Sequence, residues 1–121
     1  MSARLNIALA QMNQRVGDLA GNADAMLARR AEAAAKGADL IVFPEMQLIG
    51  YPAEDLIQKP ALAVLAAAEL ERMAAATQDG GPAMLVGTLH KDASGALYNA
   101  VALLDGGRVA ALRFKHELPN Y

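Results

Sequence analysis

The chain has 121 residues, of which 55% are hydrophobic and 20% charged, and this size supports one modest hydrophobic core. A formal net charge of −2 and an aromatic content of 4% argue against nucleic-acid binding, because the chain offers neither a basic stripe nor a set of base-stacking rings. The absence of cysteine excludes a disulfide scaffold, a thiolate metal site and a thiol nucleophile within these residues.

A strand and an amphipathic helix are predicted at the start of the chain. Residues 5–13, LNIALAQMN, have the alternating pattern of a strand. Asn22 is the predicted N-cap of the helix that follows, and Gly37 is the residue that ends it. The helix is expected to turn an apolar stripe to the core, formed by Met26, Leu27, Ala31, Ala34 and Ala35. Its solvent face is expected to carry Arg29, Arg30, Glu32 and Lys36.

The remaining elements predict a mixed α/β chain with the order β-α-β-α-β-β-β. Residues 39–45, DLIVFPE, are a continuous apolar run, which is typical of a strand covered on both faces, and Pro44 ends it. A second helix is expected over residues 60–77, with these side chains turned inward: Leu62, Leu65, Leu70 and Met73. Three more strands are expected, the last two joined in a hairpin by Asp105-Gly106-Gly107: residues 83–90, 96–105 and 108–116. No internal repeat, linker or second domain is recognisable.

The polarity of the chain favours a cytoplasmic protein without a membrane partner. The first apolar run is too short and too interrupted for a signal peptide. The Ala-rich second helix carries Glu69, Glu71 and Arg72, so we do not expect it to span a membrane.

Polar residues near the predicted strand ends are the candidates for chemistry. Glu45 follows a buried strand, where open α/β sheets place ligands and catalytic groups, although a solvated loop glutamate would fit the same position. Lys115 lies at the end of the last strand, where it could equally protect the sheet edge or lie in water. Asn99 is expected to satisfy nearby backbone groups. His90 and His116 lack the spacing of metal ligands, so no metal site is predicted.

Three segments of the sequence resemble the nitrilase, or carbon–nitrogen hydrolase, superfamily. They are VFPEMQLIGYPAEDL (42–56), LYNAVALLDGGRV (97–109) and RFKHELPNY (113–121). Within these segments, GYPAEDL and LPNY are similar, more narrowly, to the glutaminase domain of the glutamine-dependent NAD+ synthetases. The resemblance implies the α-β-β-α sandwich of the superfamily, with residues 1–121 as the N-terminal half of one glutaminase domain.

The resemblance also implies which residues form the site. The Glu-Lys-Cys triad of the superfamily would take Glu45 as the general base and Lys115 as the cation beside the oxyanion. These two side chains are expected to approach within about 4 Å. The cysteine would follow LPNY, beyond the residues given, so this segment alone is expected to be inactive. Tyr121 matches a position that helps to bind glutamine. Tyr51 matches a tyrosine near the catalytic glutamate, with a half-buried turn aromatic as the alternative.

The implied reaction is hydrolysis of the glutamine amide and transfer of the ammonia to a synthetase domain outside this segment. In that domain ATP and Mg²⁺ would serve the amidation of deamido-NAD+ to NAD+, and no cofactor is expected in the segment itself. Members of the superfamily commonly assemble, so a homo-oligomer is expected. Two alternatives stay open. One is another amidase of the superfamily that acts on a small amide, and the other is a non-catalytic interaction fragment that assembles through an exposed sheet.

Overall fold

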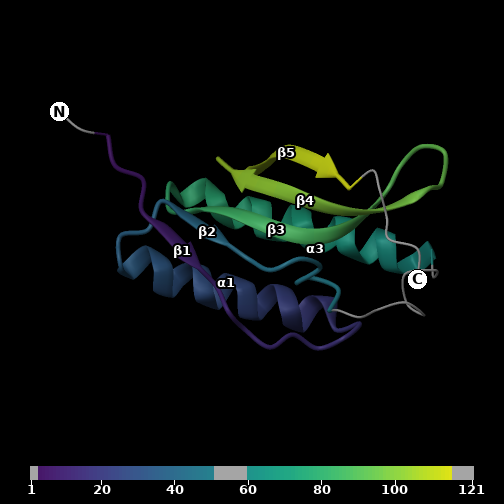
Figure 1. Ribbon diagram of the computed structural model, residues 1–121, viewed down its shortest axis with the longest axis horizontal. Helices are drawn as coiled ribbons and strands as arrows, with labels where there is room; N and C mark the ends of the chain where they lie inside the picture. Colours follow the sequence, from purple (N-terminus) through teal and green to yellow (C-terminus); the bar gives the residue numbers. More distant parts are fainter. Residues whose placement is uncertain (1–2, 51–59, 116–121) are drawn as a thin grey trace.

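The computed structural model describes residues 3–50 and 60–115, which form a sheet with helices packed against it (Figure 1). The order of the elements is the predicted one, and their bounds are β1 (Ile7–Leu9), α1 (Leu19–Ala35), β2 (Leu40–Val42), α3 (Pro60–Ala76), the short 3₁₀ helix η1 (Thr77–Asp79), β3 (Ala83–Lys91), β4 (Leu97–Asp105) and β5 (Arg108–Phe114). The first two strands are therefore shorter than the sequence predicts. None of the helices in the described part of the chain is long and apolar enough to cross a membrane.

The direction of the strands brings two strand ends to one edge of the sheet. The five strands lie side by side in chain order; β1, β2 and β3 run parallel, and β4 is antiparallel to both β3 and β5. Strand β5 therefore runs in the same direction as β2, so the residues that follow these two strands leave the sheet at the same edge. The first residues of β4 lie at that edge too, because β4 runs in the opposite direction.

The hydrophobic core lies between the helices and one face of the sheet. Registered positions of neighbouring strands point into it, with Ile41 of β2, Met84 of β3 and Leu104 of β4 all buried. Helix α1 contributes Met26 and helix α3 contributes Met73, both fully buried. This arrangement is one helix layer on one sheet layer, as in one half of the predicted sandwich.

The opposite face of the sheet is apolar and is covered by none of the described elements. Side chains alternate between the two faces of a strand, so Leu9, Val42, Leu85 and Leu103 align across four strands on the face away from the helices. Leu9 is 76% exposed, and Val101 on the same face is 37% exposed. The prediction that residues 39–45 are covered on both faces is therefore wrong for this segment, in which Val42 is only half-buried.

Helix α1 begins earlier than the sequence predicts. Asp18 is its N-cap, and the Asp18 Oδ1 accepts the N–H of Gly21 at 3.0 Å. Asn22, the predicted cap, lies inside the helix and is 3% exposed. Both residue types can cap a helix, and here Asn22 is needed for contacts with loops described below.

The solvent face predicted for α1 is wrong at Arg30, which is 6% exposed. Its guanidinium makes a bidentate pair with Asp79, at 2.7 and 3.0 Å, and its Nε donates to the carbonyl oxygen of Pro82 at 2.8 Å. The Arg30 guanidinium, helped by the N–H of Gly81, holds the pKa of Asp79 well below its usual range. Because the buried face of α1 includes this arginine, three residues predicted to face the core are exposed: Ala31, Ala34 and Ala35.

The inward face predicted for α3 is wrong at one position. Leu62, Leu70 and Met73 are buried as expected, but Leu65 is 54% exposed. Ala66, the next residue, is fully buried. A small residue at that position lets the helix lie close to its neighbours, and the larger leucine falls on the outer side.

The hairpin of β4 and β5 contains a register shift of one residue. Leu104 pairs with Val109, whereas Leu103 pairs with Ala111, so Ala110 is an extra residue in β5. Because side chains alternate along a strand, this extra residue exchanges the face of every later side chain in β5.

Candidate active site

Glu45 lies in a compact loop that follows β2. The Phe43 N–H donates to the carbonyl oxygen of Leu85 in β3 at 3.0 Å, and Pro44 has no N–H with which to continue this pairing. The chain then turns back, with the Gln47 N–H donating to the carbonyl oxygen of Pro44 at 3.2 Å. The loop therefore presents Glu45 at the edge of the sheet, where the side chain of this residue is 58% exposed.

Gly87 of β3 allows the loop to rest directly on the sheet. A Cβ atom at this position would lie 2.5 Å from both the Met46 nitrogen and the Pro44 oxygen, which is closer than real Cβ contacts. The Leu48 N–H also donates to the carbonyl oxygen of Gly87 at 3.2 Å. Glycine at this position therefore lets the backbone of the Glu45 loop pack directly against the backbone of β3. This packing sets the distance between Glu45 and β3.

Asn22 holds the same loop from the other side. Its Nδ2 donates to the carbonyl oxygens of Leu48 at 3.0 Å and Arg15 at 2.7 Å, and its Oδ1 accepts the Arg15 N–H at 2.8 Å. The Gly17 N–H donates to the carbonyl oxygen of Ile49 at 2.9 Å. The buried amide is therefore fully used in joining two loops, which explains why Asn22 is not a helix cap.

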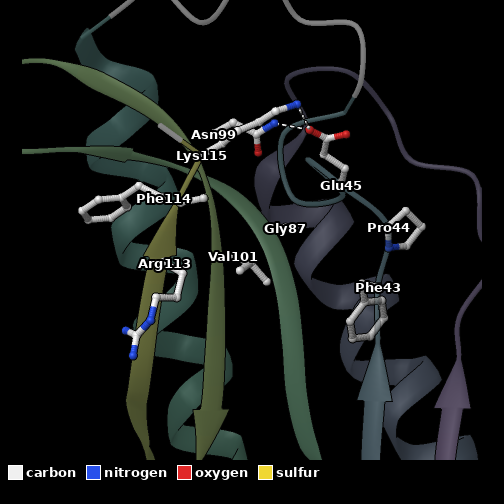
Figure 2. Close-up of a pocket in the computed structure, with 10 residues that line it drawn as sticks. Phe43, Pro44, Glu45, Gly87, Asn99, Val101, Arg113, Phe114 and Lys115 are labelled. Atoms are coloured by element: carbon white, nitrogen blue, oxygen red, sulfur yellow. Dashed lines mark hydrogen bonds and ion pairs between the residues drawn. The ribbon is translucent and has the colours of Figure 1, made fainter. Parts of the chain in front are cut away.

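Lys115 follows β5 and meets Glu45 across the edge of the sheet. The distance from the Lys115 Nζ to the Glu45 Oε1 is 3.7 Å, which confirms the predicted approach (Figure 2). The side chain of Lys115 is 47% exposed, so both members of the pair are open to solvent. The approach follows from the sheet topology, because Glu45 lies in the loop after β2, Lys115 directly follows β5, and these two strands run in the same direction.

Asn99, the third residue of β4, contacts both members of this pair. Its Nδ2 donates to the Glu45 Oε1 (Figure 2), and its carbonyl oxygen accepts the Lys115 N–H at 2.9 Å. The prediction that Asn99 satisfies nearby backbone groups is therefore wrong for its side chain, which donates to Glu45. The signal that could have identified it is the pairing of Asn99 with Lys115 across the hairpin, and that pairing depends on the extra residue Ala110.

An open cavity of about 390 Å³ lies beside the Glu45–Lys115 pair. Its lining is formed by Phe43, Pro44, Glu45, Gly87, Asn99, Ala100, Val101, Arg113, Phe114 and Lys115. Since Val101 points away from the helices, the cavity opens on the uncovered face of the sheet. A carboxylate and an ammonium group at such a cavity can accept a proton and stabilise developing negative charge.

The other predicted site residues add no contacts here. Tyr51, Tyr121 and His116 lie outside the described residues. His90 stacks on Phe114, with the ring centroids 4.9 Å apart, so the described contact of this histidine is packing within the sheet. Within residues 3–50 and 60–115, no group of three or more His, Cys, Asp or Glu side chains could hold a metal ion.

Comparison with known proteins gives four consistent similarities. A model of the carbon–nitrogen hydrolase family matches residues 6–120. The glutamine-dependent NAD+ synthetase of Rhodobacter capsulatus is 44% identical over 120 residues, which are 99% of this chain and 21% of that protein. The solved glutamine-dependent NAD+ synthetase of Acinetobacter baumannii superposes with a TM-score of 0.88 at 34% identity, covering 95% of this chain and 21% of that one. A solved amidase from Nesterenkonia gives a TM-score of 0.85 at 25% identity, covering 97% of this chain and 44% of the amidase. The chain therefore spans about a fifth of the length of its synthetase relatives.

Proposed function

Because the chain belongs to the carbon–nitrogen hydrolase family, we propose that it supplies the glutamate and the lysine of a glutaminase site in a longer glutamine-dependent NAD+ synthetase. The nitrilase fold predicted from the sequence is confirmed by the superpositions on the synthetase and the amidase. The observation that carries the proposed chemistry is the 3.7 Å approach of Lys115 to Glu45 beside an open cavity.

In the proposed reaction, Glu45 takes the proton of a cysteine thiol supplied by a part of the enzyme outside these 121 residues. The thiolate sulfur attacks the side-chain carbonyl carbon of glutamine, and Lys115 stabilises the negative charge that develops on the carbonyl oxygen. The C–N bond breaks as the nitrogen takes the proton back from Glu45 and leaves as ammonia. Water then hydrolyses the thioester, with Glu45 again accepting a proton and returning it to the sulfur, and glutamate is released.

The later steps of the proposal belong to a synthetase domain. There, ATP with Mg²⁺ would activate deamido-NAD+, and the ammonia from glutamine would complete NAD+. We propose no cofactor for the segment itself. Tyr51 and Tyr121 are proposed to lie at the glutamine-binding end of the site, and assembly into a homo-oligomer and a cytoplasmic location stay predictions of the same kind.

A second candidate function is hydrolysis of a small aliphatic amide without a synthetase partner. The Nesterenkonia amidase favours it, because the chain superposes on that enzyme almost as well as on the synthetase. A Glu45–Lys115 pair would serve a cysteine in either enzyme, so the substrate is what distinguishes the two functions.

The test uses the complete protein that contains this chain. It should form NAD+ from deamido-NAD+ and ATP with either glutamine or ammonium as the nitrogen donor, and butyramide should be a poor donor. Butyramide hydrolysis without glutamine-driven NAD+ formation would favour the second candidate. Purified residues 1–121 should release no glutamate from glutamine above a buffer control, because they contain no thiol. Glutamate release by that segment would refute the cysteine-dependent mechanism.

A further inference from the structure

One donor from β4 and one donor that directly follows β5 converge on one oxygen of Glu45. The Asn99 Nδ2 and the Lys115 Nζ both meet Oε1. None of the hydrogen bonds between described residues ends on Oε2, and this oxygen points away from both donors (Figure 2). The terminal torsion of a glutamate is broad and roughly two-fold, so a carboxylate without such contacts could exchange its oxygens. Among residues 3–50 and 60–115, Oε1 therefore has two contacts and Oε2 has none.

Asn99 is the more rigidly placed of the two donors. It pairs with Leu89 of β3 on one side, and its carbonyl oxygen accepts the Lys115 N–H on the other. Its side chain also has fewer rotatable bonds than that of Lys115. Lys115, by contrast, follows the end of β5 and reaches Glu45 through a flexible four-carbon stem. The contact that sets the orientation of the carboxylate is therefore the one from β4.

We propose that Asn99 is a positioning residue for the general base: its amide anchors the Glu45 Oε1, so that Oε2 is the oxygen that accepts the thiol proton. This inference rests on the proposed function, in which Glu45 is the base. The proposal assigns a separate role to each group around the Glu45 carboxylate. Asn99 fixes the orientation of the group, Lys115 remains available to the oxyanion, and the open oxygen performs the proton transfer.

The role requires a hydrogen-bond donor and not only a side chain of this shape. An N–H group that donates to a carboxylate makes one of the stronger hydrogen bonds in proteins. Aspartate has almost the same shape as asparagine but carries two acceptor oxygens, so it would repel Glu45. Replacement by Asp therefore distinguishes a positioning donor from a residue that fills space.

The experiment measures kcat and KM for glutamine in the complete enzyme, with NAD+ formation as the readout. Asn99→Leu should lower kcat by about 10- to 100-fold, since a hydrogen bond to a charged group is lost, and should leave KM within about twofold. Asn99→Asp should be at least as impaired as Asn99→Leu. Ammonium-driven NAD+ formation and the melting temperature should be unchanged in both variants. Gln78→Leu is the matched control, because it removes an exposed amide beside Gly107, at the far end of the hairpin.

The outcomes separate this inference from the proposed function. Full kcat in Asn99→Asp, an equal loss with ammonium, or a change confined to KM would each overturn the positioning role. If the wild-type enzyme makes no NAD+ from glutamine but hydrolyses butyramide, the proposed function fails while the same variants test Asn99 with that amide. A wild-type enzyme that hydrolyses neither amide would overturn both.

Discussion

Lys115→Met in the complete enzyme should separate catalysis from stability. The Lys115 Nζ lies 3.7 Å from the Glu45 Oε1, and the two side chains are 47% and 58% exposed. An ion pair as open to water as this one contributes about 0–1 kcal/mol to folding, so the melting temperature should fall by no more than about 2–4 °C. Methionine keeps a long apolar stem but removes the charge beside the oxyanion. Loss of one such donor lowers kcat by about 10²- to 10³-fold, so glutamine-driven NAD+ formation should collapse.

The assay compares two nitrogen donors in the same preparation. Synthesis from ammonium should persist in Lys115→Met, because it bypasses amide hydrolysis. Lys91→Met provides the control: Lys91 is another exposed lysine at the end of a strand, and it does not line the cavity. Loss of both activities in a well-folded Lys115→Met enzyme would mean that Lys115 does something other than stabilise the oxyanion. Retention of both activities would mean that Lys115 is a solvent-exposed lysine at the end of a strand, without a role in catalysis.

Three further changes test the surroundings of the site. Gly87→Ala should destabilise the fold by about 1–3 kcal/mol, because the new methyl group would displace the Glu45 loop. The same displacement should lower kcat with glutamine. An unchanged urea midpoint would contradict the close approach of the Glu45 loop to β3. Asn22→Ala should destabilise by about 1–3 kcal/mol, because backbone groups of Arg15 and Leu48, part-buried and buried respectively, lose their partner. A urea midpoint equal to that of the wild type would show that the Asn22 hydrogen bonds do not stabilise the fold. Asp79→Asn should lower the free energy of unfolding near neutral pH. The difference in unfolding free energy between variant and wild type should become smaller as the pH falls below 3.8, the ordinary pKa of Asp. The direction of this change follows because Arg30 lowers the pKa of Asp79 in the folded state. The stability gained from the ionised Asp79 is present above the unfolded-state pKa and is lost as the pH falls through the folded-state pKa. Urea midpoints that differ equally at pH 7 and pH 2 would exclude a role for the ionised Asp79.

The order of the elements could be predicted because it depends on local patterns. Apolar runs, turn residues and Pro44 mark the strands and helices without reference to the rest of the chain. Glu45 and Lys115 could be identified because both follow strands in segments that resemble a known family. Their approach then follows from the common direction of β2 and β5.

The errors at Arg30, Asn22 and Asn99 concern residues whose partners are distant in the sequence. Arg30 has the character of a surface residue until it is paired with Asp79, 49 positions away. Asn22 has the character of a cap until its contact with Leu48, 26 positions away, is known. No local pattern contains such information, because the partner becomes a neighbour only after the chain has folded. The same holds for Asn99, whose side-chain contact with Glu45 spans 54 positions.

The extra residue in β5 makes the length of the hairpin part of the proposed active site. In a regular hairpin without the extra residue, the side chain of Lys115 would point to the face of the sheet that the helices cover. There its ammonium group would meet the hydrophobic core. The presence of Ala110 moves it to the side of Asn99 and Glu45. An engineer could therefore exchange Ala110 for many other residue types with little effect on where the lysine points. Removing one residue between the turn and Lys115 would keep both Glu45 and Lys115 in the sequence and still turn the ammonium group away from the carboxylate. In this hairpin, the side to which Lys115 points therefore depends on the number of residues after the turn more than on the type of residue at position 110.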